Sequence, residues 1–162
     1  MSTDLREAFD QASGKKTPWN PSKTATARVT TSGGALPAPT TCPHCQAKVD
    51  IVNNEAIYGR PYGEWPWAYS CTGCRAYVGM HPYTAIPLGT LATPEIREAR
   101  KRAKSAFNPI WQNGRMKRGA AYAWLAEQLG IPKNECHIGW SGIEQCERIV
   151  AICTMHLKAR SA

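Results

Sequence analysis

No run of the 162-residue chain comes near the roughly eighteen consecutive apolar residues that a transmembrane helix requires. The sequence also has no apolar N-terminal signal segment, which argues against an oxidising compartment and against disulfide pairing of its seven cysteines. We therefore expect a soluble, cytoplasmic protein that has no membrane partner.

Catalytic groupings are missing as well. No histidine lies between Cys45 and Cys71, which excludes the His-Asn-His unit that some nucleases hold between two Cys-x-x-Cys pairs. Clusters of acidic residues that could bind a catalytic metal are absent. Cys136 and His137 are adjacent, but neighbouring side chains rarely point at one another, and no third residue is placed to orient them. We predict that the protein is not an enzyme.

The most informative pattern is a pair of Cys-x-x-Cys motifs, separated by 25 residues without a further Cys or His. Zinc in a structural site takes four ligands in a tetrahedron, and each Cys-x-x-Cys turn places two thiolates on one side of the ion. The intervening β-branched and aromatic residues favour strands. The sequence predicts a zinc ribbon that holds one Zn²⁺ per chain through Cys42, Cys45, Cys71 and Cys74.

Two other uses of these cysteines are the alternatives to structural zinc. A thiol-disulfide oxidoreductase would need a βαβ setting around Cys42 and Cys45, and that setting is missing. Disulfides would leave one of the seven cysteines unpaired. A c-type haem is excluded because neither motif is followed directly by histidine.

The predicted fold class is α+β, with a small zinc-ribbon sheet followed by a helical C-terminal part of three to four helices. Residues 1–38 are rich in Pro, Gly, Ser and Thr and are expected to form a disordered basic arm, because such composition buries little apolar surface. Docking of Trp19 on the core is the alternative. We assign 39–92 to the ribbon and 93–162 to a helical region packed on it.

Helix boundaries can be read from capping residues and breakers. Thr93-Pro94-Glu95 is typical of a helix start, and this helix should end before Asn108-Pro109. A second helix is predicted from Lys117 to Leu129, where Gly130 stops it. Ser141-Gly142-Ile143-Glu144 has the pattern of a capping box that opens the last helix.

Positive charge is concentrated in residues 93–118, which hold eight Lys or Arg against Glu95 and Glu98 and so carry +6 of the chain's +8. Such a concentration is a plausible contact surface for the phosphates of DNA or RNA. A solvated helix face is the alternative interpretation. The predicted nucleic-acid-binding residues are Arg97, Arg100, Lys101, Lys104, Arg115, Lys117 and Arg118.

A second metal site is a further hypothesis. Its candidate ligands lack the tight paired spacing of a zinc site. On the last helix, Cys146 and Cys153 fall on an apolar stripe and are more readily interpreted as small core residues. The candidate ligands are Cys136, His137, Cys146, Cys153 and His156.

Several segments together resemble a family of zinc-finger-containing proteins from bacteriophages and bacterial genomes. The resemblance covers about residues 40–153 and implies a phage or prophage setting and zinc at the four paired cysteines. It implies no catalytic residue, because the family is uncharacterised in function. The segments that carry it are the two Cys-x-x-Cys motifs, Ala76-Tyr77-Val78-Gly79-Met80-His81-Pro82, Pro87-Leu88-Gly89-Thr90-Leu91-Ala92, Ala121-Tyr122-Ala123-Trp124-Leu125-Ala126 and Cys136-His137-Ile138-Gly139-Trp140.

These observations lead us to expect a non-enzymatic, zinc-binding, phage-type protein that contacts nucleic acid through a basic helix. The alternative function is a phage-encoded modulator or inhibitor of a host protein, active in host takeover or against host defence. Such a protein would act by protein-protein binding in the bacterial cytoplasm. The cysteines and the basic residues are compatible with both functions.

Overall fold

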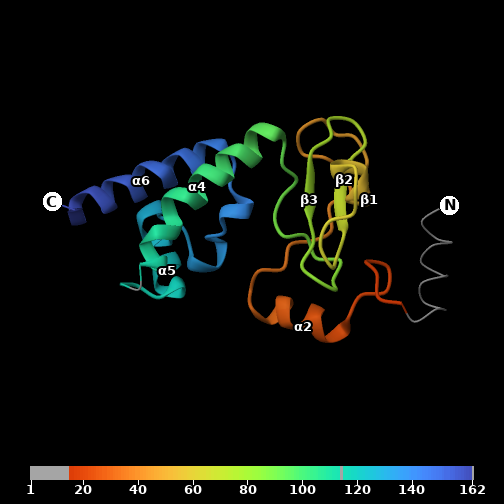
Figure 1. Ribbon diagram of the computed structural model, residues 1–162, viewed down its shortest axis with the longest axis horizontal. Helices are drawn as coiled ribbons and strands as arrows, with labels where there is room; N and C mark the ends of the chain where they lie inside the picture. Colours follow the sequence, from red (N-terminus) through yellow and green to blue (C-terminus); the bar gives the residue numbers. More distant parts are fainter. Residues whose placement is uncertain (1–14, 114, 162) are drawn as a thin grey trace. The chain divides into compact units, whose positions relative to one another are not determined.

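The structure is a computed structural model that describes residues 15–113 and 115–161. The chain divides into two compact units, Met1–Leu91 and Ala92–Ala162. The first contains a small antiparallel sheet and the second consists of helices (Figure 1). This arrangement confirms the predicted α+β class. The packing of the helical region on the ribbon stays a prediction.

In the described part of the first unit, the sheet has three antiparallel strands in the order β1-β2-β3. Strand β1 is Val49–Asn53, β2 is Trp67–Cys71 and β3 is Tyr77–Gly79. The short helix α3, Glu55–Tyr58, lies in the connection between β1 and β2. Residues Val49, Tyr69 and Val78 are buried in one apolar cluster, which also contains two of the four paired cysteines. The sheet therefore positions the two cysteine pairs against the core of this unit.

Residues 17–31 are folded, which differs from the disordered arm expected over 1–38. Thr17 and Pro18 are buried, and the indole of Trp19 lies edge-on against Trp67 at 5.3 Å between ring centroids. Helix α2, Lys23–Thr31, follows, and its N-cap Ser22 accepts a hydrogen bond from the backbone N–H of Ala25. Residues 1–14 of the expected arm lie outside the described part of the chain.

The second unit contains three long helices and two short 3₁₀ helices. Helix α4 is Pro94–Gln112, α5 is Arg118–Leu129 and α6 is Ile143–Ser161. The 3₁₀ helices η1, Lys133–Glu135, and η2, Ile138–Trp140, connect α5 to α6. Helices α4 and α6 lie side by side (Figure 1). The core is formed by apolar side chains of all three long helices, including Ala103, Phe107, Ala121, Leu125, Cys146, Ile149 and Cys153.

Helix α4 extends past the predicted stop before Asn108-Pro109 and ends at Gln112. A proline inside a helix costs about 3 kcal/mol, because it lacks an N–H and crowds the preceding turn. Ile110 is buried and Trp111 packs against the core. Each such side chain contributes about 1.5–3 kcal/mol when fully buried. Burial of the residues beyond Pro109 therefore offsets the cost of the proline.

In the described ranges, no helix combines the length and the apolar character that crossing a bilayer would take.

Helix α5 ends as predicted at Leu129, and Gly130 adopts a left-handed conformation with φ of 70°. The backbone N–H of Ile131 then donates to the carbonyl of Ala126, which closes the helix end.

Candidate metal centre

The four paired cysteines meet at one end of the sheet. Their sulfur atoms all lie within 4.8 Å of one another. Cys42 Sγ is 3.6 Å from Cys74 Sγ, and Cys45 Sγ is 3.3 Å from Cys71 Sγ. Zn–S bonds of about 2.3 Å in a tetrahedron place the sulfurs about 3.8 Å apart. The quartet therefore fits one Zn²⁺, as the sequence predicts.

The two Cys-x-x-Cys turns have the same backbone hydrogen bonds. In the first, Cys42 N–H donates to the carbonyl of Ala47, and in the second, Cys71 N–H donates to the carbonyl of Ala76. The residue after each second cysteine has a left-handed backbone, with φ of 65° at Gln46 and 63° at Arg75. The site is thus built from two equivalent turns related by an approximate symmetry.

Backbone N–H groups also point at the sulfurs. His44 N–H donates to Cys42 Sγ over 3.4 Å, and Gly73 N–H donates to Cys71 Sγ over 3.2 Å. Donors of this kind stabilise negative charge on sulfur, as metal-bound thiolates require. The His44 side chain does not belong to the group of ligand atoms that the described residues bring together, and its Nε2 lies 2.9 Å from the carbonyl oxygen of Leu91. A carbonyl only accepts, so Nε2 is the protonated nitrogen.

The pKa values of Cys71 and Cys74 are shifted in opposite directions. Burial raises the pKa of Cys71, but N–H groups of Gly73 and Cys74 and two neighbouring thiols outweigh it and lower this pKa to about 6. For Cys74, the N–H of Ala76 lowers the pKa, whereas burial and the other three thiols raise it to about 11. Four thiolates at this spacing repel one another, so full ionisation requires a cation among them.

The second metal site has no such geometry. Among the residues that the structure describes, the quartet is the one group of three or more His, Cys, Asp or Glu with ligand atoms close enough for a metal. His137 Nε2 pairs with the carbonyl of Asn134, and His156 packs against the ring of Trp124. The remaining candidates, Cys136, Cys146 and Cys153, are buried in the apolar core of the second unit.

The predicted basic residues of α4 divide into two groups. Arg97, Lys101 and Lys104 lie at i, i+4 and i+7, along one stripe of the helix, and none of them is among its buried residues. Arg100 is only 9% exposed, and its Nε–H donates to the carbonyl of Ser141 over 2.9 Å. Arg100 is therefore part of the protein interior and does not belong to the surface.

The three basic residues beyond α4 are exposed. The Arg118 guanidinium lies 5.0 Å from the ring centroid of Tyr122 and 5.7 Å from that of Trp111. Lys117 is the N-cap residue of α5. Arg115 lines a cavity of about 260 Å³ together with His156 and Arg160.

An exposed aromatic cluster on the first unit was missed by the sequence predictions. Tyr58, Tyr62 and Tyr77 have ring centroids about 6 Å apart in two edge-to-face or tilted contacts. The signal was present in Tyr58-Gly59-Arg60-Pro61-Tyr62-Gly63, where aromatic residues lie in a Gly- and Pro-containing turn that offers no strand or helix face to bury them.

Comparison with known proteins supports the metal assignment. Residues 38–156 match the family DUF3268, described as a zinc-finger-containing domain. The match covers most of the chain, so the chain belongs to this family. No curated protein matches the chain, and no solved structure matches it. The family description agrees with the four-cysteine geometry and assigns no specific function.

Proposed function

We propose that this zinc-stabilised protein binds nucleic acid through a cationic face of α4 formed by Arg97, Lys101 and Lys104. The supporting observation is that none of the three cations is among the buried residues of α4, since Lys101 and Lys104 are exposed and Arg97 is half-buried. At 1.5 Å per residue they span about 10 Å, which corresponds to about three phosphates along one strand. The spacing suits a run of consecutive phosphates.

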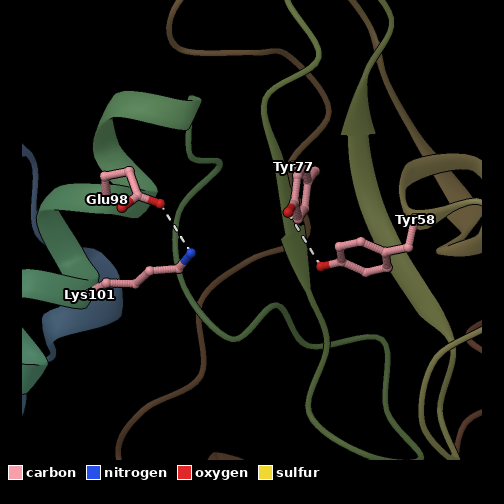
Figure 2. Close-up of polar contacts among 4 residues, drawn as sticks. All are labelled: Tyr58, Tyr77, Glu98 and Lys101. Carbon is pink, nitrogen blue, oxygen red and sulfur yellow. Dashed lines mark hydrogen bonds and ion pairs between the residues drawn. The ribbon is translucent and has the colours of Figure 1, made fainter.

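The lysines of this face are exposed and, within the described residues, are held by at most one weak ion pair. Lys101 Nζ pairs with Glu98 Oε1 at 3.0 Å on the exposed side of α4 (Figure 2). Both side chains are well exposed, and such pairs contribute about 0–1 kcal/mol. The Arg97 guanidinium donates to the carbonyl of Ala92 over 2.6 Å, which fixes its position at the start of the face. Lys104 is exposed.

Arg118 adds a cation that is already oriented. Its guanidinium is positioned over Trp111 and Tyr122, in the geometry of cation–π contacts. A flat, oriented guanidinium binds a phosphate with a smaller loss of side-chain entropy than a mobile lysine does. Trp111 is the last aromatic residue of α4, so Arg118 continues the positive potential beyond the end of that helix.

Salt-dependent binding tests the proposal. Affinity for fluorescent DNA and RNA oligonucleotides is measured by anisotropy over a range of salt concentrations, for the wild type and for Lys101→Ala/Lys104→Ala. Each lost phosphate contact flattens the slope of log K against log[salt] by about 0.7–0.9. The double variant should bind more weakly on all sequences and flatten the slope by about 1.4–1.8 units.

The matched control is Lys133→Ala/Lys158→Ala, which removes two exposed lysines of the same unit that lie outside α4, on η1 and α6. It should leave the slope unchanged. An equal loss in both double variants would show a nonspecific effect of net charge. If the wild type retains a bacterial protein from nuclease-treated lysate and binds no oligonucleotide, modulation of a host protein replaces this proposal.

A further inference from the structure

The tyrosine cluster is defined as Tyr58, Tyr62 and Tyr77, of which the first two are exposed and Tyr77 is half-buried. Tyr58 is 53% exposed and Tyr62 is 65% exposed. The Tyr58 ring stands nearly perpendicular to that of Tyr77, and their hydroxyl oxygens lie 3.3 Å apart (Figure 2). Large aromatic groups that remain in water are typical of binding surfaces, because their burial is favourable.

The loop that carries two of these tyrosines is held in place by a buried side chain. Asn54 is 9% exposed, and its Nδ2 donates to the carbonyl of Tyr62 over 2.9 Å. The backbone N–H of Tyr62 donates to Asn54 Oδ1 over 2.9 Å. This pair of hydrogen bonds closes the loop across eight residues. Ordering the aromatic residues before a ligand arrives reduces the entropy lost on binding.

Two exposed guanidiniums accompany the cluster in sequence. Arg60 lies between Tyr58 and Tyr62, and Arg75 precedes Tyr77 by two residues. Among the described residues neither forms an ion pair with a carboxylate. The connection between β1 and β2, residues 54–66, also carries Glu55 and Glu64, and Glu64 accepts a hydrogen bond from the hydroxyl of Tyr83. Exposed arginines that flank tyrosines in sequence are suited to an anionic ligand with flat apolar groups.

We infer that the tyrosine cluster stacks the bases of single-stranded nucleic acid, with Arg60 and Arg75 attracting its phosphates. Aromatic rings beside cations are the usual elements of single-strand binding, since every base has a face that can stack. In a duplex those faces are covered by neighbouring base pairs. A proline-rich peptide would also pack on tyrosines, but it would make no use of the two guanidiniums.

This inference rests on the proposed function and specifies that the nucleic acid is single-stranded. The test measures binding of single-stranded and duplex oligonucleotides of one sequence by the wild type, Tyr62→Ala and Tyr62→Phe. Loss of one stacked base should lower the affinity of Tyr62→Ala for the single strand about five- to a hundredfold. The salt slope should not change, because no charge is removed. Tyr62→Phe keeps the ring and should bind like the wild type.

The matched control is Tyr83→Ala, which removes an exposed tyrosine of the same unit outside the cluster and should leave the affinity unchanged. A second measurement needs no variant: a fluorescent purine analogue within the strand should be quenched when it stacks on the wild-type protein. Equal binding by Tyr62→Ala and the wild type, or absence of quenching in the complex, would overturn the inference.

The two proposals fail in different ways. If duplex and single strand bind equally, with a salt slope that responds to Lys101 and Lys104, only the stacking inference is wrong. If no oligonucleotide binds, both proposals are wrong. Capture of a proline-rich peptide that Tyr62→Ala abolishes would assign the tyrosine cluster to a peptide and would also overturn the stacking inference.

Discussion

The Nε–H of Arg100 donates to the backbone carbonyl of Ser141 over 2.9 Å in the interior of the helical unit. This bond joins α4 to the segment that opens α6. Burial lowers the pKa of Arg100, whereas the Cys146 thiolate would raise it. A guanidinium nevertheless stays charged at any ordinary pH, so the charge is retained in the interior by its hydrogen bond.

Replacement of Arg100 should therefore destabilise the fold. Hydrogen bonds to charged groups contribute about 1.5–3 kcal/mol, and we expect Arg100→Ala to lower the free energy of unfolding by an amount in this range. Urea denaturation followed by circular dichroism measures it. Arg102→Ala, which removes an exposed arginine of the same helix, should change the stability by no more than about 0.5 kcal/mol. Equal stabilities of the two variants would show that the Arg100 bond contributes nothing.

Gly73→Ala tests the second cysteine turn. A Cβ at this position would lie 2.9 Å from Ala47 Cβ, closer than real Cβ atoms pack, and 3.1 Å from Cys45 Sγ, which is a tight contact. The two turns must move apart, so zinc affinity should fall at least tenfold in competition with a chromophoric chelator. Gly119→Ala on α5 is the matched control, because its Cβ meets nothing within 4 Å. Unchanged affinity in Gly73→Ala would contradict the close approach of the turns.

The four metal ligands could be predicted from the sequence because the residues that identify them are close together in the chain. Each pair of ligands lies within one four-residue turn, and the chemistry of Cys42, Cys45, Cys71 and Cys74 limits the ion. The end of α5 at Leu129 was likewise predicted from a short pattern. In these cases the residues that determine the structure are neighbours in the chain.

The errors arose where distant residues decide the outcome. The basic pattern of α4 placed Arg100 on the surface, yet its partner Ser141 is 41 residues away in sequence. Helix α4 was predicted to end before Pro109, but it continues because Ile110 is buried in the core. The polar composition of the N-terminal segment led to the prediction of disorder, although Trp19 of this segment contacts Trp67. Neither residue spacing nor composition predicts any of these contacts.

The contact between Trp19 and Trp67 predicts that the N-terminal segment contributes to stability. An edge-to-face ring pair contributes about 0.5–1.5 kcal/mol beyond the apolar area it buries. Trp19→Ala should lower the melting temperature of the protein and increase tryptic cleavage at Lys23 and Arg28. Trp19→Phe retains an aromatic ring and should behave more like the wild type. Identical melting and cleavage of Trp19→Ala and the wild type would show that the segment is not docked.

Stability should also fall at alkaline pH. Burial and, to a smaller extent, the neighbouring Cys136 raise the pKa of Cys153 from 9.0 to about 11. A thiol whose pKa is higher in the folded state stabilises the fold fully below pH 9, and this contribution is lost as the pH rises towards 11. Urea midpoints for Cys153→Ala should therefore decline less between pH 8 and pH 11 than those of the wild type. An equal decline would contradict burial of this thiol.

Measuring the zinc content is the most direct test of the four-cysteine metal centre in the first unit. Elemental analysis of the purified protein should give one zinc per chain, because the four sulfurs form a single tetrahedral site. Cys71→Ser should lose the zinc together with the cooperative thermal transition of the ribbon, since closed zinc sites contribute folding energy directly. A protein without zinc, or a Cys71→Ser variant that retains one zinc per chain and the same transition, would contradict the four-cysteine centre.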